Sequence, residues 1–322
     1  MARVQRSVVL IFLFVLAACA RSISFSVEVN DAVPFPATAT ATATTIVTLP
    51  TPWVTDFAPT APAPLPTFSF PTQERPVDFS PVLYGGNLYG KSFFLLLGGV
   101  SRNGWITPVE SFARFSGEVT YSLNTLTIAS KYFVWGQAPQ FTPTCQNYFV
   151  DTDTGLDEAD FTAVVDGWNV TKREVTELAD DGLIYQQAVL DWLMAQGVDS
   201  PQPGTLQVFR VDLEGDGVNE IFISATHLDG SQHITNPGDY SIVLMRKVNS
   251  NDAVTIPVVA DVYSSKNAGL TLPRTYTLAN FIDLNQDGIM EVVVDVRKWE
   301  GFGAIVYQVQ GQDVTQTLRT EC

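Results

Sequence analysis

The last third of the chain carries one nine-residue acidic pattern twice, each time between two runs of apolar and β-branched residues. The first copy is DLEGDGVNE at 212–220, and the second is DLNQDGIME at 283–291. Side chains with oxygen atoms stand at positions 1, 3 and 5 of both copies, glycine stands at position 6 and glutamate at position 9. Because glycine accepts the left-handed backbone that a sharp bend requires, each copy predicts a tight turn between two strands.

The strands around these turns recur in the same order and indicate an internal repeat. The expected strands are 206–211, 221–226, 240–248 and 254–259 in the first repeat, and 277–282, 292–297, 303–309 and 313–318 in the second. The sequence therefore predicts a β-rich α+β fold with two four-stranded antiparallel blade-like repeats. The alternative is a small or incomplete β-propeller, since two units are fewer than the four blades that closure typically needs.

Ahead of the repeats, one segment has the composition of a helix. Leu183–Gln196 contains strong helix formers and ends at Gly197. Its apolar residues cover most of the helix circumference, so we expect one buried helix between layers. Residues 77–160 contain strand-like runs such as 92–97 and 132–136. We therefore divide the globular region into an N-terminal β-rich part, 77–160, and a part with the helix and both repeats, 161–322.

The oxygen spacing of the two acidic turns suits a hard cation. Ca²⁺ takes six to eight oxygen ligands, and a loop around one ion presents alternate side chains inward while a backbone carbonyl follows the glycine bend. The expected ligands are Asp212, Glu214, Asp216, Val218 (carbonyl) and Glu220 in the first turn, and Asp283, Asn285, Asp287, Ile289 (carbonyl) and Glu291 in the second. The sequence thus predicts two structural calcium sites.

Both turns resemble the calcium loops of FG-GAP and VCBS-type repeats, whose motif is Asp-x-Asp-x-Asp-Gly-x-x-Asp between two strands. The resemblance covers two nonapeptides and their flanking strands, and it implies that each ion staples a hairpin within a repeat. The chain departs from the motif at position 3, where Glu214 and Asn285 replace Asp, and at position 9, where both turns carry Glu. A glutamate at position 9 has to fold back to reach the ion.

The N-terminus has the features of an export signal. Arg3 and Arg6 precede an apolar run, 8–16, that is too short to span a bilayer. Leu16-Ala17-Ala18-Cys19 resembles a bacterial lipobox, which implies cleavage after residue 18 and lipidation of Cys19. Two or three acyl chains on one residue anchor a protein stably. We therefore expect a lipoprotein signal peptide at 1–18 and an extracytoplasmic protein held on a membrane through Cys19.

Residues 19–76 predict a flexible stalk. Repeated proline removes backbone donors and fixes φ, and the Ala-Thr tract at 37–44 offers little to bury. Once Cys19 is lipidated, Cys145 and Cys322 are the two remaining thiols. Since an exported chain sits in a compartment that permits disulfides, we expect these two cysteines to form one.

Charge and composition exclude several functions. The formal charge of -16 disfavours nucleic acid as a partner, and two histidines with three cysteines are too few for most zinc, copper or iron–sulfur sites. No catalytic or organic-cofactor motif stands out, so the expected function is a non-catalytic surface binding or structural module. Two alternatives stay open: an extracytoplasmic hydrolase using acids such as Asp151, Asp153 or Glu118, and a module that binds polysaccharide or an extracellular protein through exposed aromatics. The sequence leaves the oligomeric state open.

Overall fold

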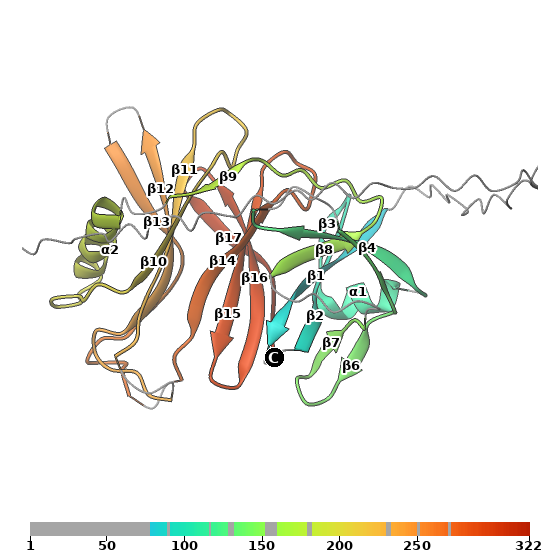
Figure 1. The fold of residues 1–322 in the computed structure, drawn as a ribbon, viewed down its shortest axis with the longest axis horizontal. Coiled ribbons are helices and arrows are strands. Elements are labelled where there is room, and N and C mark those ends of the chain that lie inside the picture. The colour runs from blue at the N-terminus through green and yellow to red at the C-terminus, as the bar shows by residue number, and fades with distance from the viewer. Residues whose placement is uncertain are drawn as a thin grey trace, which may run out of the picture. The chain divides into compact units, whose positions relative to one another are not determined.

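Three antiparallel sheets and one helix lie side by side in the computed structural model (Figure 1). The structure describes residues 78–88, 91–115, 117–127, 132–151, 160–178, 182–229, 233–249, 252–269 and 272–322, all within one compact unit, Ser69–Cys322. The predicted signal peptide at 1–18, Cys19 and the predicted stalk at 19–76 lie outside the described residues. No helix in the described ranges is long and apolar enough to cross a membrane.

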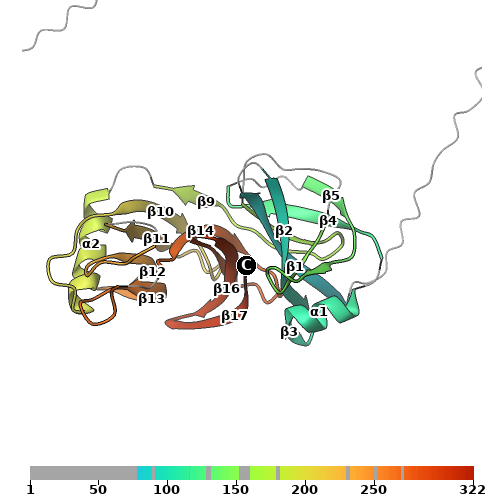
Figure 2. The same ribbon diagram turned by 90° about the horizontal axis from the view of Figure 1, so that it is seen from below.

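The N-terminal sheet has eight strands and curls on itself (Figure 2). Its order is β5-β4-β8-β1-β2-β7-β6, with β3 paired to β2. The strands are β1 (Phe79–Leu88), β2 (Lys91–Ser101), β3 (Gly104–Ile106), β4 (Val119–Thr125), β5 (Tyr132–Gly136), β6 (Gln140–Thr142), β7 (Asn147–Phe149) and β8 (Phe161–Val165). Because β8 belongs to this sheet, the sheet continues past the boundary expected at residue 160.

A short helix, α1 (Pro108–Arg114), lies against β2 of this sheet. Thr107 caps its N-terminus, because the Thr107 side chain accepts from the Glu110 N–H while the Glu110 carboxylate accepts from the Thr107 N–H. This reciprocal capping box, with proline at the first helical position, explains why a helix starts here in a β-rich region.

The two repeats form the other two sheets. The first repeat sheet has the order β13-β12-β11-β10-β9, and the second has the order β14-β15-β16-β17. The strands are β9 (Val175–Glu177), β10 (Thr205–Val211), β11 (Glu220–His227), β12 (Tyr240–Asn249), β13 (Asp252–Val262), β14 (Thr275–Ile282), β15 (Glu291–Lys298), β16 (Gly301–Gln310) and β17 (Asp313–Glu321). Each of the eight predicted repeat strands is thus present, and β9 extends the first sheet.

The second repeat sheet lies between the other two. One apolar cluster joins it to the first repeat sheet and includes Phe222 and Phe281, whose ring centroids are 4.7 Å apart. Another cluster joins its opposite face to the N-terminal sheet and includes Val293. Because both faces are covered, Val292, Val293 and Val294 are all fully buried. This placement accounts for the continuous apolar run in β15.

Helix α2 (Gly182–Ala195) covers the remaining face of the first repeat sheet (Figure 1). The prediction that it is buried between layers is wrong. Val189 and Leu193 pack against the sheet, whereas Leu183, Ile184 and Met194 are exposed. The helix has one layer beneath it and none above in the described part of the chain, so its apolar circumference does not reflect burial on all sides.

The predicted disulfide is confirmed. Cys145 and Cys322 are bonded, with their Cα atoms 4.7 Å apart across a sequence separation of 177 residues. Cys145 lies between β6 and β7, and Cys322 follows β17. The bond therefore ties the second repeat sheet to the N-terminal sheet. In the same region the Asn147 side-chain amide donates to the Glu321 carbonyl at 2.6 Å.

Candidate metal-binding loops

The two acidic turns lie next to each other. The first loop, 212–220, joins β10 to β11, and the second loop, 283–291, joins β14 to β15. The Met290 N–H donates to the Leu213 carbonyl at 3.0 Å. Arg173 donates to the Leu213 carbonyl at 2.8 Å and to the Gly288 carbonyl at 2.6 Å, so one guanidinium links both loops. The fold therefore gathers the predicted ligands at the same end of two neighbouring sheets.

The glycine bends have the predicted backbone. Gly217 has φ 86° and Gly288 has φ 90°, in the left-handed region that favours glycine. In the first loop, the Asp212 carboxylate accepts hydrogen bonds from the N–H groups of Gly215, Asp216 and Gly217. In the second loop, the Asp283 carboxylate accepts from the Gly288 N–H at 3.1 Å. The first aspartate thus holds the backbone of each loop in its turn.

The closing glutamate folds back into each loop, as its length requires. Glu220 Oε2 accepts from the Leu213 N–H at 3.0 Å, and Glu291 Oε2 accepts from the Leu284 N–H at 2.7 Å. Both glutamates are almost fully buried. A carboxylate at position 9 therefore lies inside its loop in both repeats, where it is withdrawn from water.

The first loop contains a cation supplied by the protein. Lys247 Nζ lies 2.7 Å from Glu214 Oε2 and 3.2 Å from Glu220 Oε1. Burial opposes the charge on this amine, but hydrogen bonds and charges from Glu214 and Glu220 outweigh it and raise the pKa of Lys247 above its usual value. The ligand positions 3 and 9 of this loop are therefore already paired with a positive charge.

The second loop has carboxylate oxygens without partners. Asp283 Oδ1 and Glu291 Oε1 are buried and accept no hydrogen bond from any described residue. Glu220 Oε1 of the first loop also accepts none, but Lys247 Nζ lies 3.2 Å from it. The two side chains are 2% and 0% exposed, respectively. Burial raises the pKa of Glu291 to about 8 and also raises the pKa of Asp283. Burying a carboxylate oxygen without a partner costs free energy. A bound cation or a proton would therefore stabilise this loop.

Within the described ranges, no three His, Cys, Asp or Glu side chains stand together as a preformed metal centre. The loop carboxylates are instead bonded to N–H groups of their own turns, as the Asp216 and Asp287 contacts with Val218 N–H and Ile289 N–H show, both at 2.8 Å. The two unpartnered oxygens of the second loop are nevertheless the kind of hard ligand that Ca²⁺ takes. The residues of that loop fit the predicted ion on this ground.

Sequence reasoning missed the side chains that face the closing glutamates from the next strand. In the first repeat β11 pairs Ile221 with Arg246, and in the second β15 pairs Val292 with Tyr307. One step along each ladder, Lys247 stands opposite Glu220 and Gln308 stands opposite Glu291. Gln308 donates to Asp287 Oδ2 at 3.0 Å. The lysine and the glutamine are equivalent in the ladders but not in the sequence offset, because the Asp-Gly turns are 71 residues apart and these two residues are 61 apart.

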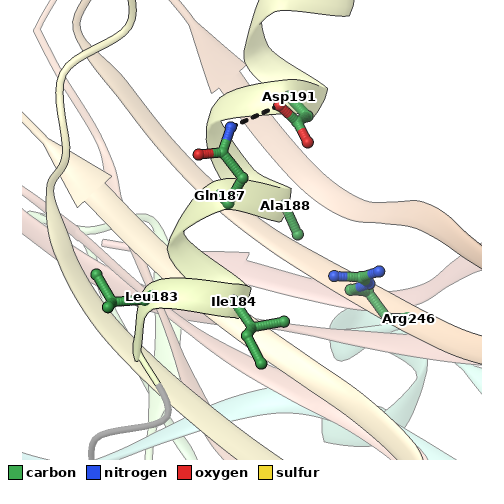
Figure 3. Close-up of a pocket in the computed structure, with 6 residues that line it drawn as sticks. All are labelled: Leu183, Ile184, Gln187, Ala188, Asp191 and Arg246. Atoms are coloured by element: carbon green, nitrogen blue, oxygen red, sulfur yellow. Dashed lines mark hydrogen bonds between the residues drawn. The ribbon is translucent and has the colours of Figure 1, made fainter.

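The acids considered for a hydrolase form no described site. Asp151 and Glu118 are exposed, and Asp153 lies outside the described residues. A hollow of about 460 Å³ lies elsewhere, between α2 and β12 (Figure 3). Its lining combines exposed apolar side chains with the Gln187–Asp191 hydrogen bond of 2.7 Å and the guanidinium of Arg246. This lining contains no pair of carboxylates for hydrolysis.

Comparisons with known proteins found no match: no family model, no curated protein and no solved structure matches this chain. The resemblance of the two loops to FG-GAP and VCBS-type repeats therefore stays a prediction based on the loop sequences.

Proposed function

We propose that this protein is an exported, lipid-anchored calcium-binding protein that acts as a non-catalytic surface binding or structural module. The observation that carries the calcium proposal is the second loop, where Asp283 Oδ1 and Glu291 Oε1 are buried and accept no hydrogen bond from the residues that the structure describes. A divalent cation would satisfy both oxygens and neutralise the surrounding carboxylates.

Calcium would act structurally in this proposal. The ion would be held by the predicted ligands of each loop and would brace the β10–β11 and β14–β15 connections. Each repeat would then be a blade-like four-stranded unit closed by its own ion. The supporting contact is that Glu220 and Glu291 already fold back onto Leu213 and Leu284 at the base of their loops.

Calcium-dependent stability tests this proposal. The melting temperature should rise when calcium replaces a chelator, because an ion that binds only the folded state adds about 2.7 kcal/mol per site at a hundredfold excess over Kd. Asp216→Ala and Asp287→Ala should each reduce the rise in melting temperature that calcium causes. In chelator, the melting temperatures of the variants and the wild type should differ much less. Identical melting temperatures with calcium and with chelator, together with no heat on titration with calcium, would contradict the proposal.

The membrane location is a separate proposal based on Leu16-Ala17-Ala18-Cys19. The mature N-terminus would be a diacylated or triacylated Cys19 that anchors the protein on a membrane outside the cytoplasm, at the cell surface or in the periplasm, with residues 20–76 as a spacer. Radiolabelled palmitate should enter the wild-type protein and should not enter Cys19→Ser. Equal labelling of both proteins would contradict the lipid anchor while leaving the calcium proposal untouched.

One observation favours a second candidate, polysaccharide binding. Phe112 of α1 stacks on Tyr148 of β7 with ring centroids 4.5 Å apart, and Phe141 of β6 meets the same tyrosine at 5.5 Å. Phe141 is 52% exposed and Phe112 is 38% exposed. Flat aromatic faces open to solvent suit sugar rings. Retardation of the protein in polysaccharide-containing gels, lost in Phe141→Ala, would support this role.

A further inference from the structure

The two loops share one pattern, yet the protein supplies different side chains to their position-9 glutamates. Ladder register places Lys247 opposite Glu220 and Gln308 opposite Glu291. One loop therefore receives a positive charge from the neighbouring strand, and the other receives a neutral amide.

In the first loop, the lysine ammonium lies between two of the carboxylates that are predicted to bind the metal ion. Its ammonium contacts Glu214 and Glu220, which are the predicted ligands at positions 3 and 9, at 2.7 and 3.2 Å. The Lys247 side chain is 17% exposed, so this charge is largely removed from water. Glu214 is held further by the Gly311 N–H, which donates to its Oε1 at 3.2 Å. A cation can use these two carboxylates only after the ammonium has moved away.

In the second loop, no charged group of the described residues occupies that place. Gln308 donates to Asp287, and the buried Glu291 Oε1 and Asp283 Oδ1 have no hydrogen-bond donor or ion-pair partner among the described residues. Asn285, at position 3, donates to Asp287 at 2.9 Å and adds no charge. These unpartnered buried oxygens are a second observation, independent of the acidic sequence, that points to a bound cation.

We propose that Lys247 is a built-in counter-cation of the first loop, so that the second loop binds calcium tightly and the first binds it only by displacing the lysine. This inference rests on the proposed calcium-binding function. It predicts that the two sites fill in sequence, second loop first, instead of together. It also assigns the difference in affinity to one pair of equivalent residues, Lys247 and Gln308.

Exchanging these two residues tests the proposal. In the chelator-stripped full chain, calorimetric titration with calcium should resolve a tight site and a weak one. Lys247→Gln should tighten the weak site at least about tenfold, because affinity in such loops follows the charge that surrounds the ion. Gln308→Lys should weaken the tight site at least about tenfold by placing an ammonium beside Glu291. Asp216→Ala and Asp287→Ala identify which loop each site belongs to.

A matched control separates the local effect from a general loss of positive charge. Lys298→Gln is the same substitution at a partly exposed lysine, whose Nζ lies 3.5 Å from Glu321 Oε2. This control should leave both affinities unchanged. Circular dichroism before titration shows whether each variant is folded. If a variant does not fold, terbium titration of the wild type provides the readout, because Trp168 donates to the Leu284 carbonyl at 2.7 Å and can sensitise an ion bound in the second loop.

The outcomes distinguish the two proposals. If neither calcium nor terbium binds, the proposed function fails. Two sites of equal affinity that respond to neither exchange would overturn the role of Lys247 while leaving calcium binding intact. Terbium luminescence that appears only after the weak site fills would also overturn it, because the second loop would then be the weak site.

Discussion

The two repeat sheets share a strand order and a turn, yet they occupy different places in the molecule. The second repeat sheet is covered by a sheet on each face, whereas the first has a sheet on one face and the single helix α2 on the other. The loops differ as well: Glu220 has Lys247 beside it, whereas no described cation pairs with Glu291. The nine-residue pattern thus determines where the strands and the bend form. The surrounding residues determine the burial and the charge pairing of each side chain.

The largest expected effect concerns the disulfide, which holds the second repeat sheet and is absent from the first among the described residues. We expect Cys145→Ala with Cys322→Ala to lower the free energy of unfolding by about 2–5 kcal/mol, because the bond closes a loop of 177 residues. Urea denaturation measures this difference. Hydrogen exchange should show β17 losing protection before β13 does. A loss below about 1 kcal/mol would mean that packing alone holds β17 in place.

The same isoleucine-to-alanine substitution in each repeat sheet compares how tightly the two sheets are packed. Ile305 of β16 lies between the two repeat sheets, and Ile242 of β12 lies beneath α2, with both side chains fully buried. Truncation to alanine costs about 2–5 kcal/mol in a core, and more where the surroundings cannot collapse. Ile305→Ala should therefore fall near the upper end and Ile242→Ala near the lower end, because a single helix can shift to fill a gap. Equal losses in chemical denaturation would contradict this ranking.

Substitution of the closing glutamates should have unequal effects on the stability of the calcium-free protein. Glu220→Gln removes the charge that Lys247 contacts at 3.2 Å and should cost about 1–3 kcal/mol. Glu291→Gln removes a buried carboxylate without a counter-charge and keeps an acceptor for the Leu284 N–H, so it should cost little or raise stability by about 1 kcal/mol. Melting in chelator measures both. Equal destabilisation by the two substitutions would contradict the proposed difference in charge pairing between the loops.

The last expected effect is a pH dependence that Asp295 adds in the second repeat. Burial, aided by the charge of Asp160, raises the pKa of Asp295 to about 6, although Arg297 contacts it at 2.7 Å. The equivalent position of β11 is the neutral Ser224. Since the folded-state pKa is raised, the contribution of Asp295 to stability is fully present below pH 4 and is lost as the pH rises through about 6.

Asp295→Asn should remove this dependence. Its stability relative to wild type should increase by about 1–3 kcal/mol between pH 4 and pH 7. Ser224→Ala should differ from wild type by the same amount at every pH. Denaturation at several pH values measures both differences, and a constant offset for Asp295→Asn would show that Arg297 keeps the aspartate charged throughout.

The strands β10, β11, β14 and β15 could be predicted because the two Asp-Gly turns fix where these strands end or begin. The disulfide followed from counting, since the expected lipidation of Cys19 would leave one possible pair. Helix α2 was placed within one residue at each end, but its burial was not predictable, because an apolar circumference does not show which layers cover it. Helix α1 could have been found from Thr107, Pro108 and Glu110, whose spacing is that of a capping box.

The candidate ligands followed from spacing, but their electrostatic state did not. Whether Glu220 and Glu291 are paired depends on strands β12 and β16, which lie across a ladder and not along the loop. Arg173, which bonds to both loops, comes from a segment that shares no pattern with either. Such contacts depend on register and topology, which a local motif does not contain.

The central position of the second repeat sheet has a consequence for how the chain folds. This sheet is formed by 275–321, after the N-terminal sheet at 79–165 and the first repeat sheet at 175–262, yet it lies between them. Until it is inserted, each of the earlier sheets exposes an apolar face to water. The contacts between the sheets join segments that are distant in sequence, such as Phe222 with Phe281, and contacts of this kind slow folding. We expect a single late transition in which all three sheets assemble together, without a stable intermediate made of the first two.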